Sequence, residues 1–309
     1  MPAPIALFTY NRPLHTLQVL EALQLNTLSG QSELYIFCDG PKIDSSAEII
    51  SNINEVRRVI RLKKWCKTVK IFERPTNMGL ANSIISGVSL MLQTHERIIV
   101  LEDDIVPLPY FLSYMNEALT MYENETDVIS ISSFNFFAKS KQIPDFFFSS
   151  IIDCWGWATW RRGWNLFEKD ADKLLTEINT KQLLSKFNVN GAYDYYGMLK
   201  ETSQGTIDSW AIRWYASGFV NNKLSLYPKI SLTKNIGFDG TGVNSKTEVY
   251  ESAFSQGARY PAIKTRIIRN DEKALQEFYE YFNPKLKTRL ILMVNSLLKR
   301  VVNVILKNK

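Results

Sequence analysis

The chain has 309 residues, of which 45% are hydrophobic and 22% are charged, and its formal net charge is +6. Such a chain can bury a large core, so we expect one large domain or two smaller ones and exclude a disordered protein. The excess charge is local, because residues 285–309 contain seven basic and no acidic side chains, which leaves the remainder close to neutral.

Strand and helix patterns alternate over the first 132 residues. Apolar runs predict strands at 4–9, 33–38, 68–72, 97–101 and 127–132. Helical spacing between them predicts helices at 14–28, 45–64, 80–93 and 109–123. Strands separated by helices imply right-handed crossovers, so we expect an α/β fold with a mostly parallel sheet flanked by helices.

Polar residues follow four of the predicted strands. They are, in chain order, Arg12, then Asp39, then Asn77 and Gly79, then Glu102, Asp103 and Asp104. In sheets of this kind ligands bind at the carboxyl ends of the strands, so we expect these residues to converge on one edge.

The three consecutive carboxylates at 102–104 directly follow a buried strand. Burying carboxylates is costly and adjacent anions repel, so the triplet should face solvent or a cation. Oxygen ligands of this kind suit Mg²⁺ or Mn²⁺ together with substrate phosphates, although a solvated turn is the alternative. His15 and His95 lie near no cysteine or acid cluster of the sequence, so a histidine-based zinc site is not expected.

Two segments of the second half are rich in aromatic residues or glycine. Residues 155–164 contain four tryptophans, whose rings suit either a sugar platform or a core layer between sheet and helices. Residues 235–242 contain three glycines and form either a mobile lid over a charged ligand or an ordinary turn.

Seven short segments, in this order and spacing, resemble inverting glycosyltransferases of the GT-A fold. The pattern is similar to the bacterial family A sugar transferases and, more distantly, to Golgi N-acetylglucosaminyltransferase I. The resemblance covers roughly residues 4–245. The segments are Phe8-Thr9-Tyr10-Asn11-Arg12-Pro13, Phe37-Cys38-Asp39-Gly40, Asn77-Met78-Gly79-Leu80-Ala81-Asn82, Leu101-Glu102-Asp103-Asp104, Cys154-Trp155-Gly156-Trp157, Asp208-Ser209-Trp210 and Asn235-Ile236-Gly237-Phe238-Asp239-Gly240.

The resemblance implies a donor site for a nucleotide sugar, UDP-linked, at the ends of the strands. Asp104 would bind the Mn²⁺ or Mg²⁺ that bridges the donor diphosphate. The other contacts would be Asp103 near the ribose, Glu102 near the donor sugar, Asp39 on the nucleobase, Arg12 on the diphosphate, and Asn77 and Gly79 where the backbone approaches the nucleotide. The C-terminal histidine ligand of some branches is missing, so Asp104 and water would have to suffice.

Asp208 is the expected general base, which takes the proton from the acceptor hydroxyl as it attacks the anomeric carbon. A helix N-cap is the alternative role for Asp208, and Asp239 is the competitor for the base. Residues expected at the acceptor or in a lid are Trp155, Gly156, Trp157, Gly237, Phe238, Asp239 and Gly240.

We therefore expect a transferase domain at 1–245, divided into a nucleotide-sugar half (1–132) and an acceptor half (133–245), followed by a helical region at 246–309. In the basic tail at 285–309 apolar residues recur on one helical face, as in helices that lie on a membrane surface. Packing of this helix on its own domain or on a partner subunit is the alternative.

The predicted function is a metal-dependent, inverting glycosyltransferase of the hexosyltransferase type. It would add sugar to a glycan or lipid-linked acceptor in surface polysaccharide biosynthesis. Two alternatives are a catalytically inactive, membrane-associated glycan-binding protein and a nucleotidyltransferase, although residues 10–13 are not the glycine-rich basic loop that the latter needs.

The location and the partners are predicted from what the sequence lacks. Cys38, Cys66 and Cys154 show no paired spacing, and neither a signal peptide nor an apolar run long enough to span a bilayer is visible. We expect a cytoplasmic protein, peripheral at the inner face of the cell membrane through its C-terminal helix. Nucleic acid is not an expected partner, and a homo-oligomer is left open.

Overall fold

A computed structural model of the chain describes residues 1–137, 142–239, 263 and 267–283. The first half contains β1 (Ile5–Thr9), α1 (Pro13–Gln24), β2 (Glu33–Cys38), α2 (Ala47–Val59), β3 (Thr68–Glu73), α3 (Leu80–Thr94), β4 (Arg97–Glu102), β5 (Ile105–Pro107), α4 (Phe111–Met121) and β6 (Val128–Ser132). The second half contains β7 (Phe146–Ser149), β8 (Trp157–Trp160), α5 (Arg161–Trp164), α6 (Ala171–Thr180), α7 (Leu184–Phe187), α8 (Tyr195–Ser203), α9 (Trp210–Val220), β9 (Leu224–Pro228), β10 (Thr233–Asn235) and α10 (Glu272–Phe282).

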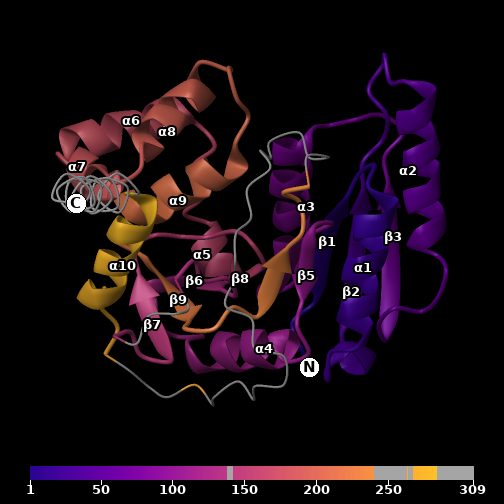
Figure 1. Cartoon of the computed structure of the whole chain (residues 1–309), viewed down its shortest axis with the longest axis horizontal. Helices are drawn as coiled ribbons and strands as arrows, with labels where there is room; N and C mark the ends of the chain where they lie inside the picture. The colour runs from indigo at the N-terminus through magenta and orange to yellow at the C-terminus, as the bar shows by residue number, and fades with distance from the viewer. Residues whose placement is uncertain (138–141, 240–262, 264–266, 284–309) are drawn as a thin grey trace, which may run out of the picture.

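An eight-stranded sheet in the order β3-β2-β1-β4-β8-β6-β9-β7 forms the centre of the described structure (Figure 1). Its pairings β3–β2, β2–β1, β1–β4 and β6–β9 are parallel, and helices pack against the sheet. The predicted α/β class with a mostly parallel sheet is therefore confirmed. Strand β8 was not predicted; it runs antiparallel between β4 and β6 and joins the two halves of the chain into one sheet.

The alternation of side chains along the strands explains why helices cover both faces. On β1 and β4, Leu7 and Ile99 pack into one cluster with Leu20 of α1, whereas Phe8 and Val100 pack into another with Ile84 of α3. All six residues are at most 3% exposed. Successive residues of a strand point to opposite faces, so apolar runs with no polar alternation require cover on both sides.

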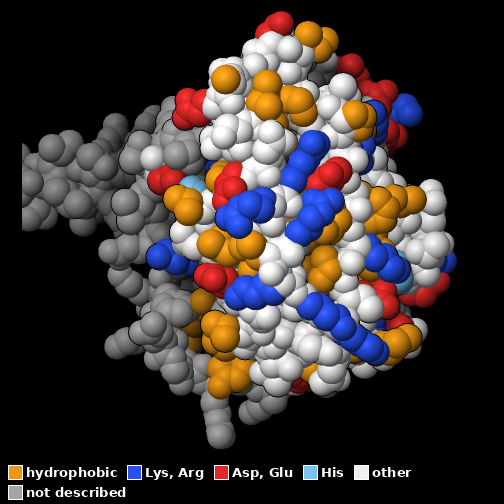
Figure 2. Space-filling view, turned by 90° about the vertical axis from the view of Figure 1, so that its right-hand side faces the viewer, with side chains coloured by type: hydrophobic (Ala, Val, Ile, Leu, Met, Phe, Trp, Pro, Cys, Tyr) orange, Lys and Arg blue, Asp and Glu red, His pale blue; other side chains and the backbone are white. Residues whose placement is uncertain are grey.

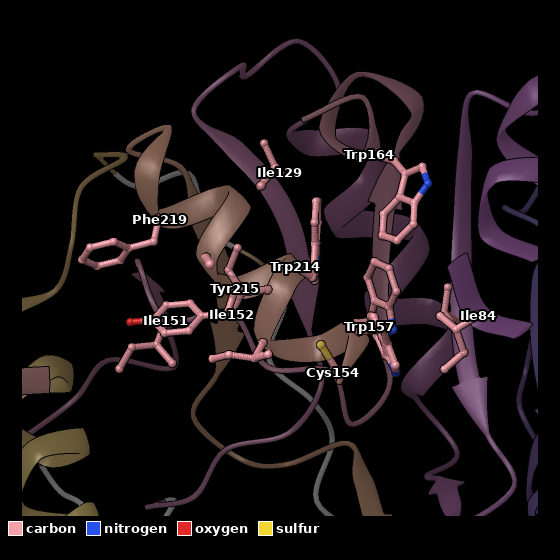
Figure 3. Close-up of a cluster of buried hydrophobic side chains, with 14 of the residues drawn as sticks. Ile84, Ile129, Ile151, Ile152, Cys154, Trp157, Trp164, Trp214, Tyr215 and Phe219 are labelled. Atoms are coloured by element: carbon pink, nitrogen blue, oxygen red, sulfur yellow. The ribbon is translucent and has the colours of Figure 1, made fainter. Parts of the chain in front are cut away.

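Four tryptophan rings form the centre of one of these clusters. Trp157, which is 0% exposed, stacks on Trp210 with ring centroids 5.4 Å apart and also contacts Trp164 and Trp214 (Figure 3). Trp157 therefore belongs to the core and not to the acceptor surface that the sequence predicts for it. A ring buried on all sides has no face to offer a sugar.

The C-terminal predictions fall mainly outside the described residues. Gly240 and the basic tail at 285–309 both lie there. The helix α10 is described, and its Phe278 packs against Phe137 and Tyr227 of the same core. The domain boundary at residue 245 stays a prediction. In the part of the chain that the structure covers, no helix is long and apolar enough to cross a membrane.

Candidate functional site

The carboxylate triplet lies where β4 ends, at the carboxyl edge of the sheet. The parallel register pairs Phe8 of β1 with Glu102 of β4, so the residues that follow these two strands are neighbours. Arg12 precedes Pro13, the first residue of α1, and keeps a non-helical backbone. Arg12 therefore belongs to the connection that follows β1 and not to the helix.

Arg12 contacts two of the three carboxylates. Its Nη2 donates to Asp103 Oδ1 at 2.5 Å and to Asp104 Oδ2 at 3.0 Å, and the Arg12 side chain is 19% exposed. Charge-assisted hydrogen bonds of this kind are stronger than neutral ones. The structure thus brings together three of the predicted donor-site residues.

The triplet carries more negative charge than Arg12 can balance. Burial raises the pKa of Asp103 to about 6, with Arg12 opposing the shift. Burial and the neighbouring Asp104 and Asp103 raise the pKa of Glu102 well above its ordinary value. Crowded carboxylates repel one another, and a further cation would relieve this repulsion, so the site is suited to a divalent metal ion.

The glycine-rich segment packs directly onto the triplet. Strand β10 pairs with β5 so that Asn235 lies opposite Ile105, and the backbone N–H of Ile236 donates to the carbonyl of Asp104 at 2.9 Å. A Cβ added to Gly237 would overlap the carboxylate of Asp104. Residues 235–239, which we call the cover segment, are thus held against Asp104, the residue that the sequence predicts as the metal ligand.

Two side chains of the cover segment reach other elements. His15 Nε2 of α1 lies 3.1 Å from Asp239 Oδ2, and Phe238 packs edge-on against Trp155 with centroids 5.4 Å apart. Trp155 is half-buried and also contacts Phe134. The ring of Trp155 thus contacts the cover segment through Phe238, and the sequence predicts both residues at the acceptor or in a lid.

Gly237→Ala tests this packing. We expect the added methyl group to displace the Asp104 carboxylate and to weaken Mn²⁺-dependent nucleotide binding by about tenfold or more, since a displacement of this kind costs about 1–3 kcal/mol. Calorimetric titration with UDP measures the effect. Gly30→Ala is the matched control, because a Cβ there meets no atom within 4 Å. Equal affinity in the two variants would refute the contact.

Asp39, Asn77 and Gly79 form a second group, built from the exits of β2 and β3. The buried carboxylate of Asp39 accepts from the backbone N–H groups of Gly40 and Met78, each at 3.0 Å. Asn77 Nδ2 donates to the carbonyl of Gly40, and its Oδ1 accepts from the N–H of Gly79, both at 3.0 Å. Gly79 has φ 78° and ψ 152°, a conformation essentially restricted to glycine.

Asp208 lies at the same edge of the sheet, before α9. Trp210 of α9 stacks on Trp157, which pairs with Val100, two residues before Glu102. The N-cap alternative for Asp208 is wrong, because Ser209 caps α9 by accepting from the N–H of Ile212 at 3.3 Å. Asp208 is instead 59% exposed, and its Oδ1 accepts from Arg213 Nη2 at 2.6 Å.

Asp153 and His15 are neighbours of the site that the sequence did not reveal. Asp153 is buried, its Oδ2 accepts from the N–H of Trp155 at 3.0 Å, and its charge contributes to the raised pKa of Glu102. An acid between the apolar residues 151–152 and 154–155 was the available signal. His15 is separated from Asp239 by more than 200 residues, so no local pattern could pair them.

We expect Asp153 to make the stability of the protein depend on pH. Burial raises the pKa of Asp153 to about 7. A carboxyl that binds its proton more tightly in the folded state stabilises below its ordinary pKa near 4, and this stabilisation, up to about 4 kcal/mol, is lost as the pH rises to 7. We expect Asp153→Asn to lose less stability than the native protein between pH 5 and pH 8, as measured by urea unfolding.

The matched control for this measurement is Asp127→Asn, since the Asp127 side chain is 68% exposed. The control should keep the native dependence on pH, and Glu102 and Asp103 should leave part of that dependence in both variants. Identical pH profiles for Asp153→Asn and the native protein would show that Asp153 is not the group responsible.

A metal ion at this site would be coordinated mainly by Asp104 and by the phosphates of a bound substrate. Among the described residues, no three histidine, cysteine, aspartate or glutamate side chains are arranged to hold a metal ion. The oxygen donors of the triplet nevertheless fit Mg²⁺ or Mn²⁺, which commonly bind to one or two carboxylates together with substrate phosphates and water.

Comparison with known proteins gives a likeness of fold and no family. No protein-family model matches the chain, and no curated protein matches it. The solved structures that resemble it include S. aureus TarS residues 1–349, with 15% identity and a TM-score of 0.29 over 43% of this chain and 35% of that one. In a further TarS structure the matched part is 24% of that chain, so this chain spans 35% or less of the TarS chains that it matches.

Two other structures match over more of their length. A UDP-glucose pyrophosphorylase complexed with UDP-glucose has 10% identity and a TM-score of 0.36, over 75% of this chain and 91% of that one. The galactosyltransferase LgtC, in complex with donor and acceptor sugar analogues, has 8% identity and a TM-score of 0.37, over 72% of each chain. A likeness at this level assigns no activity to this chain.

Proposed function

We propose that the protein is a metal-dependent, inverting glycosyltransferase that uses a nucleotide-sugar donor, UDP-linked. The observation that carries the proposal is the meeting of Arg12, Asp103 and Asp104 beneath the cover segment. This arrangement supplies a cation for a diphosphate, carboxylates for a metal ion and a segment that can shield both from water. These are the elements that transfer from a nucleoside diphosphate requires.

Each carboxylate of the triplet would contact a different part of the donor. Asp104 would hold Mn²⁺ or Mg²⁺, which when bound stabilises the negative charge of the departing nucleoside diphosphate. Asp103 would lie near the ribose and Glu102 near the donor sugar. Arg12, already fixed by Asp103 and Asp104, would turn its remaining N–H donors to the diphosphate.

The nucleobase would bind to two neighbouring loops, residues 39–41 after β2 and residues 74–79 after β3. Their hydrogen bonds among Asp39, Gly40, Asn77 and Met78 fix the backbone before a ligand arrives, so binding costs little ordering entropy. Asp39 would accept from the base N–H with its remaining lone pairs, and the glycine conformation at Gly79 would allow the close approach of the nucleotide.

Asp208 would act as the general base. The contact of its Oδ1 with Arg213 orients the carboxylate, and Oδ2 would take the proton from the acceptor hydroxyl as that oxygen bonds to the anomeric carbon and the bond to the diphosphate breaks. Attack from the face opposite the leaving group inverts the anomeric centre. Asp239 is the competing base, although in this structure it pairs with His15.

The acceptor would be a glycan or a lipid-linked oligosaccharide of a surface polysaccharide. The half-buried ring of Trp155 and the adjacent Phe238 of the cover segment would pack on its apolar sugar faces. An acceptor of this kind fits a cytoplasmic enzyme at the inner face of the membrane.

A donor screen with product analysis tests the proposal. The native protein is incubated with several nucleotide sugars, with and without Mn²⁺, and released nucleoside diphosphate and the anomeric configuration of the product are measured. We expect nucleoside diphosphate and an inverted product. Exchange of pyrophosphate with the nucleotide would indicate a nucleotidyltransferase, and glycan binding without turnover would indicate the inactive alternative.

A further inference from the structure

The positive charge of the described fold is concentrated in one short segment. Residues 57–74 contain eight basic side chains and one acidic one, a net charge of +7. The formal charge of the whole chain is +6, and residues 285–309 account for +7, so residues 1–284 sum to −1. The rest of residues 1–284, outside 57–74, therefore carries a net charge of −8.

This segment forms one lateral edge of the molecule. It contains the end of α2, the turn at 60–67 and β3, which is the edge strand because it pairs only with β2. Figure 2, which faces this side, shows lysine and arginine side chains gathered on it. The exposed cations, which we call the basic edge, are Arg58, Arg61, Lys63, Lys64, Lys67 and Lys70.

Local ion pairs neutralise only part of the basic edge. Arg58 pairs with Glu55, and Arg61 pairs with Glu73. Lys63 and Lys70 each lie 4.0 Å from a carboxylate oxygen, at the limit of an ion pair. No carboxylate of the residues covered by the structure lies within 4.0 Å of Lys64 or Lys67. A positive surface therefore remains around the turn at 60–67.

Protection of the edge strand does not explain these lysines. Lysine on an edge strand prevents pairing with other chains, and Lys70 lies on β3. Lys63, Lys64 and Lys67, however, all precede the first residue of the strand. They follow Leu62 in the same turn, and Leu62 is 46% exposed, whereas Trp65 is 1% exposed.

We propose that the basic edge docks on an anionic lipid surface. Lipid headgroups supply negative charge without a fixed shape, which suits cations spread over a face, and the acyl boundary accepts an exposed leucine among them. A single-stranded nucleic acid would call for exposed rings on which bases stack, but within the turn at 60–67 the one aromatic ring, Trp65, is buried. Docking here turns the edge strand β3 towards the membrane, and the strand exits lie at the other end of β3 from the turn at 60–67.

Vesicle co-sedimentation of the full chain tests the proposal. The variant Lys63→Gln/Lys64→Gln/Lys67→Gln is compared with Lys169→Gln/Lys186→Gln/Lys200→Gln, which removes the same charge from three exposed lysines elsewhere. On phosphatidylglycerol vesicles we expect the first variant to bind at least about tenfold more weakly than the native protein and the second to stay within about twofold. Melting temperatures establish that both variants are folded.

A second pair of variants separates the leucine from the charge. Leu62→Gln should weaken binding severalfold, whereas Leu184→Gln, at 45% exposure and in the other half, should not. Equal binding by the two triple variants would overturn the proposal. A native protein that does not bind to phosphatidylglycerol vesicles would also overturn it. Heparin binding that needs Lys63, Lys64 and Lys67 while vesicles do not bind would assign the edge to a soluble polyanion instead.

Discussion

Asp104→Asn is expected to abolish metal-dependent donor binding, whereas Asp208→Asn is expected to keep donor binding and to lower transfer about 10²–10⁴-fold. The difference follows from position, because Asp104 lies in the triplet beneath the cover segment and Asp208 is an exposed carboxylate held by Arg213. Calorimetric titration with UDP and Mn²⁺, together with initial rates of transfer, measures the two effects separately.

The control for both variants is Asp127→Asn, which removes an exposed carboxylate from its ion pair with Lys223. It should leave binding and rate unchanged. A normal rate for Asp208→Asn would make Asp239 the leading base, and His15→Gln, which releases Asp239, should then alter the pH profile of the rate. Normal donor binding by Asp104→Asn would remove the metal site from the triplet.

Arg12→Met is expected to lower the free energy of unfolding by about 3 kcal/mol at pH 7 in the absence of metal. The variant leaves Asp103 and Asp104 without their shared cation, and loss of one partner from a buried ion pair is costly. Mn²⁺ should restore part of the stability, because it replaces positive charge at the same carboxylates. Urea unfolding with Mn²⁺ and with EDTA measures both effects.

Arg58→Met serves as the control for this measurement. It breaks the exposed pair with Glu55 and should leave both the unfolding midpoint and the response to Mn²⁺ close to those of the native protein. Equal midpoints for Arg12→Met and Arg58→Met would mean that Arg12 does not compensate the triplet. The same stabilisation by Mn²⁺ in the native protein, in Arg12→Met and in Arg58→Met would mean that the metal binds elsewhere.

The first half of the fold, residues 1–132, could be predicted because its signals are local. Strands expected at 33–38 and 97–101 are observed at Glu33–Cys38 and Arg97–Glu102, and each is followed by the polar residues that mark its exit. Parallel neighbours end at one edge, so Arg12 and the triplet meet as a consequence of topology.

The second half depends on contacts that no local pattern encodes. Strand β8 is four residues long and is defined by its antiparallel partners β4 and β6. Trp157 could be a platform or a core residue by composition, and only the packing of α9 against it decides for the core. The pairs His15–Asp239 and Gly237–Asp104 join residues that are far apart in sequence, so they required the fold itself.

The triplet and Arg12 together form the metal-dependent nucleotide site that we propose. Calorimetric titration of the native protein with UDP, in Mn²⁺ and again in EDTA, tests it most directly. We predict saturable binding of UDP in Mn²⁺ that is weakened at least about tenfold in EDTA and is lost in Asp104→Asn. Equal affinity under both conditions, or no binding of UDP in Mn²⁺, would contradict it.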